Sequence, residues 1–369
     1  MTKKIICIFI FVMLFTLGVS AQETDIYKDQ LEGSGALELK EDLPQDIKEY
    51  LEQNGIDITD YNWVNNLKTE NVFSHIWGFL KGGFKKPLIA LGSIVAIVII
   101  NSLLFGDSKS SVGTVVSYAA TLSVAGIIIA PIISAINTAV NAMKACATFM
   151  TAFVPIFAAV TAAGGKTATS ISMSTLLLGA ANGVSLLSNY AAVPLIGGYL
   201  SLSLATSVSP FLDSNGISTA VKKASLWIMS LISTIFLGVL NIQTVVNSAA
   251  DNLSMRTAKF IIGSAVPVAG GVLSEALGTL TASVSLLKSS VGIYGVVICC
   301  LIFLPILIEL LLWRFTLWAA DFIATGFSLS KISELLKALD TVLSVLCGVI
   351  LLTGAMFIIS LSVVMGQQL

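Results

Sequence analysis

The sequence predicts an all-α, polytopic helical membrane protein with a cleavable signal peptide and a short extracytoplasmic N-terminal region. The first observation is composition: 56% of residues are hydrophobic and only 11% are charged, against about 25% charged residues in soluble domains. The second is a series of apolar runs near the length of about 20 residues that a helix needs to cross the hydrocarbon layer. The third is charge segregation, because 13 of the 21 acidic residues lie between Gln22 and Glu70.

Residues 1–21 have the pattern of an export signal. Lys3 and Lys4 precede an apolar stretch from Ile5 to Val19, and Ser20 and Ala21 complete the small-residue site that a signal peptidase accepts. The apolar stretch is short for an uncleaved membrane anchor. We therefore expect cleavage after Ala21.

Residues 22–86 are predicted to form an extracytoplasmic acidic leader that carries short amphipathic helices. Pro44 stands at a favourable first helical position, and Asn54-Gly55 marks the end of that helix. Its apolar stripe consists of Leu43, Ile47, Tyr50 and Leu51. A second short helix is expected after Thr59. An interfacial helix is expected over residues 72–80, where Trp77 and the following lysines suit the headgroup layer.

Residues 87–369 are predicted to form the polytopic helical domain. The expected spanning helices are Leu88–Phe105, Val112–Ile136, Met143–Ala163, Ser170–Leu187, Ala191–Val208, Ala224–Val246, Val291–Leu312 and Val342–Val364. Three interpretations stay open for the segments Phe260–Leu287 and Phe315–Phe327: full spans, half-spans or surface helices. Small residues in the helices, such as Gly179 and Gly183, predict close backbone packing.

The polar stretch after Val246 is predicted to be the working centre of the domain, with a broken helix near residues 256–287. Its candidate conduit, gating or packing residues are Arg256, Lys259, Pro267, Gly270, Gly271 and Glu275. Non-helical backbone at membrane depth is tolerated only where protein or a water-filled cavity satisfies the freed polar groups. The alternative is a short interfacial loop followed by a kinked helix.

A second set of ionisable residues lies near the C-terminus, at Glu309, Arg314 and Asp321, beside Trp313 and Trp318. Ionisable groups at membrane depth are functional candidates. The alternative, which we favour, is an aromatic belt with the charges at its wet edge. The charged residues of segment 331–340 face away from its leucines, which predicts an amphipathic helix on the membrane surface.

The lysines predict an orientation for the spans. With the leader outside, Lys109 and Lys166 fall on the cytoplasmic side, in agreement with the positive-inside rule. Lys144 and the pair Lys85-Lys86 fall outside and oppose it.

The sequence carries no motif of an enzyme, a cofactor site or a metal site. Gly164 to Thr167 is similar to the end of a phosphate-binding loop, but Val160 stands where that loop requires a glycine. His75 is the single histidine, which excludes the usual zinc sites. The four cysteines after the signal lie in apolar runs and are expected to be buried small hydrophobes. The net charge of −1 implies no nucleic-acid partner.

Two stretches of the chain are similar to each other. INTAVNAM from Ile136 resembles IQTVVNSA from Ile242, and a phenylalanine and a Val-Pro pair follow each of them. Repeats are common in transporters, although apolar sequence also produces chance matches. A self-contained secondary transporter of a small solute is therefore an alternative function.

The block LSMRTAKFIIGSAVPVAGGVLSEAL from Leu253, followed by SLLKSSVGIYGVV from Ser285, resembles the stage III sporulation protein AE family of endospore-forming bacteria. The resemblance implies a non-enzymatic, multi-pass component of the mother-cell membrane around the forespore. Its implied partners are the other stage III sporulation A-operon proteins, namely an ATPase and ring-forming subunits, together with a forespore-side partner and the lipid bilayer. The implied assembly is a transenvelope feeding channel or secretion-like apparatus. The family has no assigned catalytic residues, and a purely structural scaffold is a third hypothesis.

Overall fold

The computed structural model describes residues 31–40, 43–59, 63, 78, 82–105, 111–186, 197–201, 205, 214–265 and 270–366. Every extended element in this part of the chain is a helix. They are η1 (Ala36–Lys40), α3 (Gln45–Gln53), α6 (Lys85–Phe105), α7 (Ser111–Ala163), α8 (Thr167–Leu186), α10 (Ser214–Ala265), α11 (Gly270–Gly326) and α12 (Ser330–Gly366). The predicted signal peptide lies outside the described residues, as do most of the second leader helix and of the segment 72–80.

Five of these helices are long and apolar enough to cross a membrane. The apolar segments are Lys85–Leu103, Val112–Ala163, Ser230–Ser254, Leu287–Gly326 and Ser330–Val363. For the described residues, the prediction of an all-helical protein with several helices able to span a membrane is therefore confirmed. Helix α8 matches the expected span Ser170–Leu187 but does not belong to this apolar set.

The structure joins segments that we expected to be separate. Val112–Ile136 and Met143–Ala163 are parts of the single helix α7, because residues 137–142 contain no proline or glycine and their polar side chains lie on an exposed face. Phe315–Phe327 is the end of α11, and the expected surface helix 331–340 is the start of α12. Lys166 therefore follows the opposite end of α7 from the one that Lys109 precedes, so the two lysines would lie on opposite sides of a membrane that α7 crosses once.

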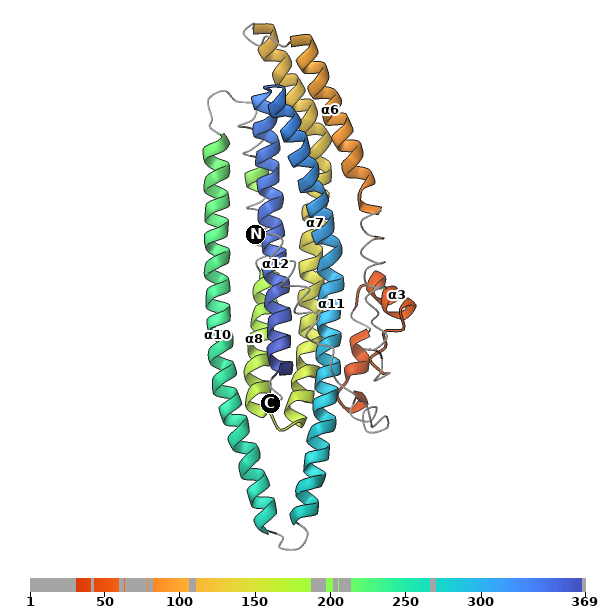
Figure 1. Ribbon diagram of the computed structural model, residues 1–369, viewed down its shortest axis with the longest axis vertical. Coiled ribbons are helices and arrows are strands. Elements are labelled where there is room, and N and C mark those ends of the chain that lie inside the picture. Colours follow the sequence, from red (N-terminus) through yellow and green to blue (C-terminus); the bar gives the residue numbers. More distant parts are fainter. Residues whose placement is uncertain are drawn as a thin grey trace.

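The long helices exceed the thickness of a bilayer. Helices α7, α10 and α11 have 53, 52 and 57 residues. At about 1.5 Å per residue each is roughly 80 Å long, whereas a bilayer with its headgroups measures about 40–45 Å. Figure 1 shows these helices aligned with the long axis of the molecule. Part of the bundle must therefore project from any single membrane that it crosses.

The core forms where α11 meets α7 and α12. Phe149, Phe153 and Phe157 on α7 stack with ring centroids 5.3 and 5.5 Å apart. A Cβ atom at Gly295 of α11 would lie 2.6 Å from Cζ of Phe153, so only glycine admits this approach. At Gly179 and Gly183, by contrast, a Cβ atom would meet nothing within 4 Å among the described residues. Both glycines are exposed, so the close packing expected there does not form with the described part of the chain.

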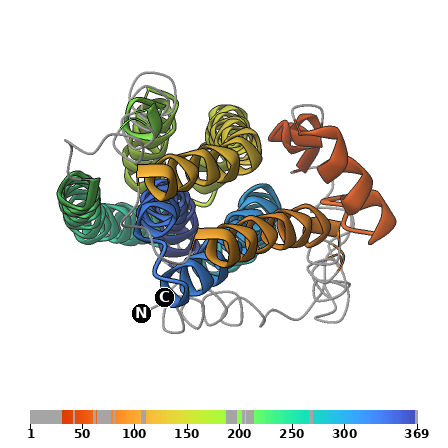
Figure 2. The same cartoon turned by 90° about the horizontal axis from the view of Figure 1, so that it is seen from above.

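The acidic leader packs against the side of the bundle opposite α10 (Figure 2). The predicted stripe on α3 is confirmed, because Ile47, Tyr50 and Leu51 are buried. Trp63 is fully buried, and its Nε1 donates a hydrogen bond to Oγ of Ser290 on α11 at 3.0 Å. Its ring meets Tyr294 edge to face, with centroids 5.8 Å apart. The leader is thus attached to α11 by an aromatic anchor.

Candidate functional site

The break predicted near residues 256–287 is a link between two helices. Helix α10 runs without interruption to Ala265, and α11 begins at Gly270 and continues through Gly271. Pro267 lies in the link, outside the described residues. The reason is local: the residues around Arg256 permit a helix, whereas a proline followed by two glycines ends one. The polar stretch is therefore the end of a helical hairpin, and the helix is interrupted within the predicted range 256–287.

This α10–α11 hairpin reaches beyond the turn that joins α7 to α8, as Figure 1 shows. Arg256 lies on the part of α10 that approaches the tip, and its side chain is exposed. Lys259 and Glu275 belong to the same hairpin, in stretches for which the structure describes the backbone alone. The fold thus brings the candidate residues to one end of the molecule. Within the described residues, no other helix covers the side chain of Arg256.

A buried carboxylate fastens the base of the hairpin to the neighbouring helix. Asp251 on α10 is 3% exposed. Its Oδ1 accepts a hydrogen bond from the backbone N–H of Ala168 at 2.9 Å, and its Oδ2 accepts one from Thr169 at 3.0 Å. These are first-turn N–H groups of α8, which have no partner inside their own helix and favour an anion. Asp251 therefore occupies the position that a phosphate would need beside Gly164 to Thr167.

Two lysines are near enough to this carboxylate to interact with it electrostatically, and we call Asp251, Lys166 and Lys288 the Asp251 cluster. Lys288 on α11 is 4% exposed, and its Nζ has no hydrogen-bond partner within the described part of the chain. It is close enough to Asp251 and Lys166 to interact electrostatically with both. Burial lowers the pKa of Lys166, and the negative charge of Asp251 partly opposes that shift. The cluster thus holds two amines for one carboxylate.

A second charged group joins α11 to α12, and we call it the α11–α12 network. Nε of Arg314 donates to Oδ1 of Asp340 at 2.8 Å. Nζ of Lys337 lies 3.8 Å from Oδ1 of Asp321, which also accepts a hydrogen bond from Ser333. Arg314 and Asp321, two of the predicted residues, therefore serve to pair the two helices.

The aromatic residues of the same part of α11 separate into two environments. Phe315, Trp318 and Phe322 are exposed and follow one another along the helix, with centroid separations of 5.9 and 6.3 Å. This row resembles the predicted aromatic belt. Trp313 does not belong to it, because it is 3% exposed.

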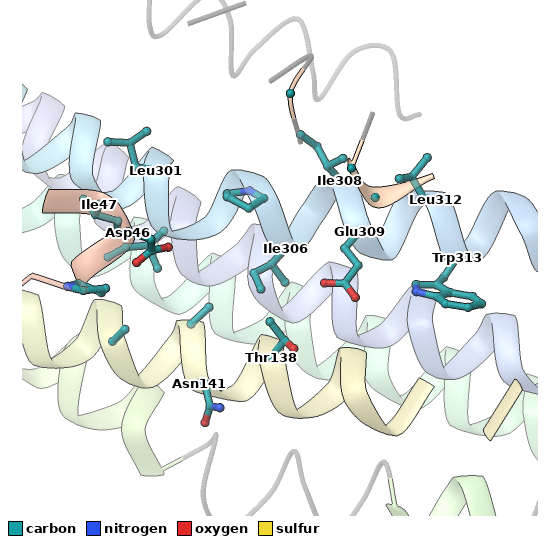
Figure 3. Close-up of a pocket in the computed structure, with 18 of the residues that line it drawn as sticks. Asp46, Ile47, Thr138, Asn141, Leu301, Ile306, Ile308, Glu309, Leu312 and Trp313 are labelled. Carbon is teal, nitrogen blue, oxygen red and sulfur yellow. The ribbon is translucent and has the colours of Figure 1, made fainter. Parts of the chain in front are cut away.

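Glu309, the remaining predicted residue, faces a cavity of about 560 Å³ between α7 and α11. Figure 3 shows its carboxylate directed toward Thr138 of α7. Neither a hydrogen bond nor an ion pair is formed by this carboxylate within the described residues. In the same part of the chain, no group of three or more His, Cys, Asp or Glu side chains converges as a metal site would require.

The sequence reasoning missed the residues that organise the base of the hairpin. Asp251 was visible as the first residue of the polar stretch, but its partners Ala168 and Thr169 lie more than 80 residues earlier. Lys288 stood inside a family-like motif and was not assigned a role. The only available signal was a pair of charged residues at the ends of apolar runs, which also describes many interfacial residues.

Comparison with known proteins gives a consistent family. A family model described as "Stage III sporulation protein AE" matches residues 59–368. A stage III sporulation protein AE of Bacillus subtilis (strain 168) is 30% identical over 164 residues, which cover 44% of this chain and 41% of that relative. The match thus spans about two fifths of the curated relative. No solved structure gives a significant match. Because the family model covers most of the chain, the protein belongs to the stage III sporulation protein AE family.

Proposed function

We propose that this protein is a non-enzymatic membrane component of the transenvelope complex between mother cell and forespore, and that its α10–α11 hairpin docks onto another subunit. The observation that carries the proposal is the reach of the hairpin beyond the α7–α8 turn. The bundle acts as a platform in the membrane around the forespore, with the leader on its extracytoplasmic side. The conduit predicted around Arg256 then forms only when other subunits enclose the hairpin.

The chemistry of the hairpin favours a protein partner. Arg256 is exposed, and Lys259 lies three residues further along the same helix, so both fall on one side of α10. Guanidinium and ammonium groups pair with carboxylates on a partner surface and fix its orientation. Asp251 holds the base of the hairpin to α8, which gives the helices beyond it a defined direction.

The test replaces both cations with alanine, R256A/K259A, in the sporulating host. We expect the yield of heat-resistant spores to fall while the amount of protein in the membrane, measured by immunoblot, stays unchanged. The matched control is R256K/K259R, which keeps both charges and should keep spore yield near the parent value. If R256A/K259A produces heat-resistant spores at the wild-type level, these two cations of the hairpin do not take part in the function.

A second function, a self-contained secondary transporter, is favoured by the Glu309 cavity, which lies beside Pro305 in the middle of α11. A proline in a helix frees a backbone carbonyl one turn earlier, a feature of discontinuous transport helices. The purified protein in liposomes would then move a small solute without other subunits. Solute movement that depends on the rest of the complex would favour the platform.

A further inference from the structure

The Glu309 cavity is walled by four parts of the chain. Its lining comes from the start of α3, the entry into α6, the middle of α7 and residues 301–313 of α11. The volume of about 560 Å³ falls within the range of small-molecule sites, about 300–1,000 Å³. Figure 3 shows the cavity lying lengthwise between α7 and α11, with Asp46 near Leu301 at one end and Trp313 at the other.

Most of the wall is apolar, and small residues make the space. Ala142 and Ala145 of α7 contribute only methyl groups to the lining, and Gly82 and Gly83 contribute none. The α11 side of the cavity carries larger apolar residues, which are Leu301, Ile302, Pro305, Ile306, Ile308 and Leu312. Such a wall favours a ligand with an apolar body.

Opposite charges also line the cavity. Glu309 lies in the wall of α11 with no hydrogen bond or ion pair among the described residues, and Lys86 reaches the lining from the start of α6. The two side chains sense each other electrostatically but are not in salt-bridge contact. Trp313, one helical turn beyond Glu309, offers an indole ring, which attracts cations to its face. The cavity therefore presents a cation-binding group and an anion-binding group that do not satisfy each other.

We propose that this cavity binds an apolar zwitterion, either an apolar amino acid or a short peptide of such residues. The ligand ammonium pairs with Glu309, its carboxylate pairs with Lys86, and its side chain packs against the isoleucines and leucines of α11. A simple organic cation bound at Glu309 would leave Lys86 unpaired and next to another positive charge. A simple anion bound at Lys86 would leave Glu309 unpaired and next to another negative charge. A zwitterion satisfies both groups. This inference is independent of the docking role of the hairpin.

The experiment is calorimetric titration of the purified full-length protein in detergent micelles with leucine and with the dipeptide Leu-Leu. The comparison ligands are isopentylamine, which is leucine without its carboxylate, and 4-methylpentanoate, which is leucine without its ammonium group. We expect leucine or Leu-Leu to bind at least about tenfold more tightly than either comparison ligand, since each charged pair contributes more than about 1.4 kcal/mol. Which of the two binds distinguishes a free amino acid from a peptide.

The variants assign the charges. E309Q should weaken binding of the zwitterion and of isopentylamine and leave binding of 4-methylpentanoate unchanged. K86M should weaken binding of 4-methylpentanoate and leave binding of isopentylamine unchanged. E49Q makes the same substitution at an exposed carboxylate of α3 outside the lining and should leave affinity within about twofold of the parent. A145L fills the cavity and should abolish binding, while T148L, one turn along α7 and outside the lining, should not.

Several results would overturn the proposal. These are no binding of leucine or Leu-Leu, equal affinity for the half-molecules, or equal effects of E49Q and E309Q. Circular dichroism and the thermal unfolding midpoint of each variant confirm that it is folded. The spore yield of R256A/K259A reports on the hairpin alone, so failure of one proposal is distinguishable from failure of the other.

Discussion

The Asp251 cluster and the α11–α12 network use the same kinds of residue in opposite surroundings. In the network, side chains of Arg314 and Asp340 are 28% and 31% exposed, and each has a partner. In the cluster, Asp251 and Lys288 are 3% and 4% exposed, and Nζ of Lys288 has no hydrogen-bond partner within the described residues. The charges of the network are balanced, whereas the cluster has one amine too many for its single carboxylate.

The difference shows that burial, more than the number of charged pairs, decides what such a group contributes. A pair in contact with water gains little, because water solvates the separated charges almost as well. A buried charge that loses its partner has no such alternative, and its removal from water then costs several kcal/mol. The hairpin base is therefore held by a few interactions of large effect, and the α11–α12 contact by several of small effect.

The largest effect is expected for D251A. This variant leaves the first-turn N–H groups of α8 without their acceptor, and it leaves the buried amine of Lys288 and the half-buried amine of Lys166 without an opposing charge. We expect the free energy of unfolding to fall by about 3–5 kcal/mol, the range for breaking a buried ionic interaction. The measurement is SDS-induced unfolding in mixed micelles, followed by tryptophan fluorescence. A loss below about 1 kcal/mol, the size of a simple capping effect, would contradict the buried cluster.

The double variant D251A/K288M sharpens this result. If the surplus amine of Lys288 causes part of the loss, removing it should recover part of the stability, and the two changes should not be additive. Strict additivity would mean that Lys288 and Asp251 do not interact.

The next largest effect is expected for K288M alone, which should stabilise the protein. Methionine has a similar length and no polar group, so it fills the same space without a buried amine that lacks a hydrogen bond. We expect the free energy of unfolding to rise by about 1–2 kcal/mol. The control is K144M, at an exposed lysine of α7, which should stay within about 0.5 kcal/mol of the parent. Destabilisation by K288M would show that the amine has a partner after all.

Composition and apolar periodicity predicted the helical membrane class and the buried stripe of α3, because both depend on local sequence. The same reasoning divided α7 into two expected spans and left residues 137–142, which include the polar Asn137, Thr138 and Asn141, between them. In the structure these polar residues occupy one exposed face of a continuing helix. Hydropathy averages over all faces of a helix and therefore cannot distinguish a polar stripe from a loop.

The candidate site was predictable only in part. The polar block from Asp251 and the carboxylate of Glu309 stand out in an apolar sequence, and the structure places the first at the base of a hairpin and the second in a cavity. The partners of these residues lie on helices that are distant in sequence, such as Ala168 for Asp251 and Thr138 across from Glu309. Only the packing of α7, α8, α10 and α11 brings them together.

The smallest effect is expected for the α11–α12 network. D340N keeps the shape of the side chain and removes its charge, so Arg314 retains a neutral acceptor in place of an ionic one. Because both side chains are about one-third exposed, we expect a loss of about 0.5–1 kcal/mol in the same unfolding assay. K337M should lower the free energy of unfolding by less, since the Lys337 ammonium lies 3.8 Å from Asp321 and the lysine side chain is 54% exposed.

Raising the salt concentration should shrink the D340N effect and leave that of D251A nearly unchanged, because mobile ions screen exposed charges much more than buried ones. Equal salt dependence of the two variants would mean that both groups are open to water, and the contrast between them would then be lost.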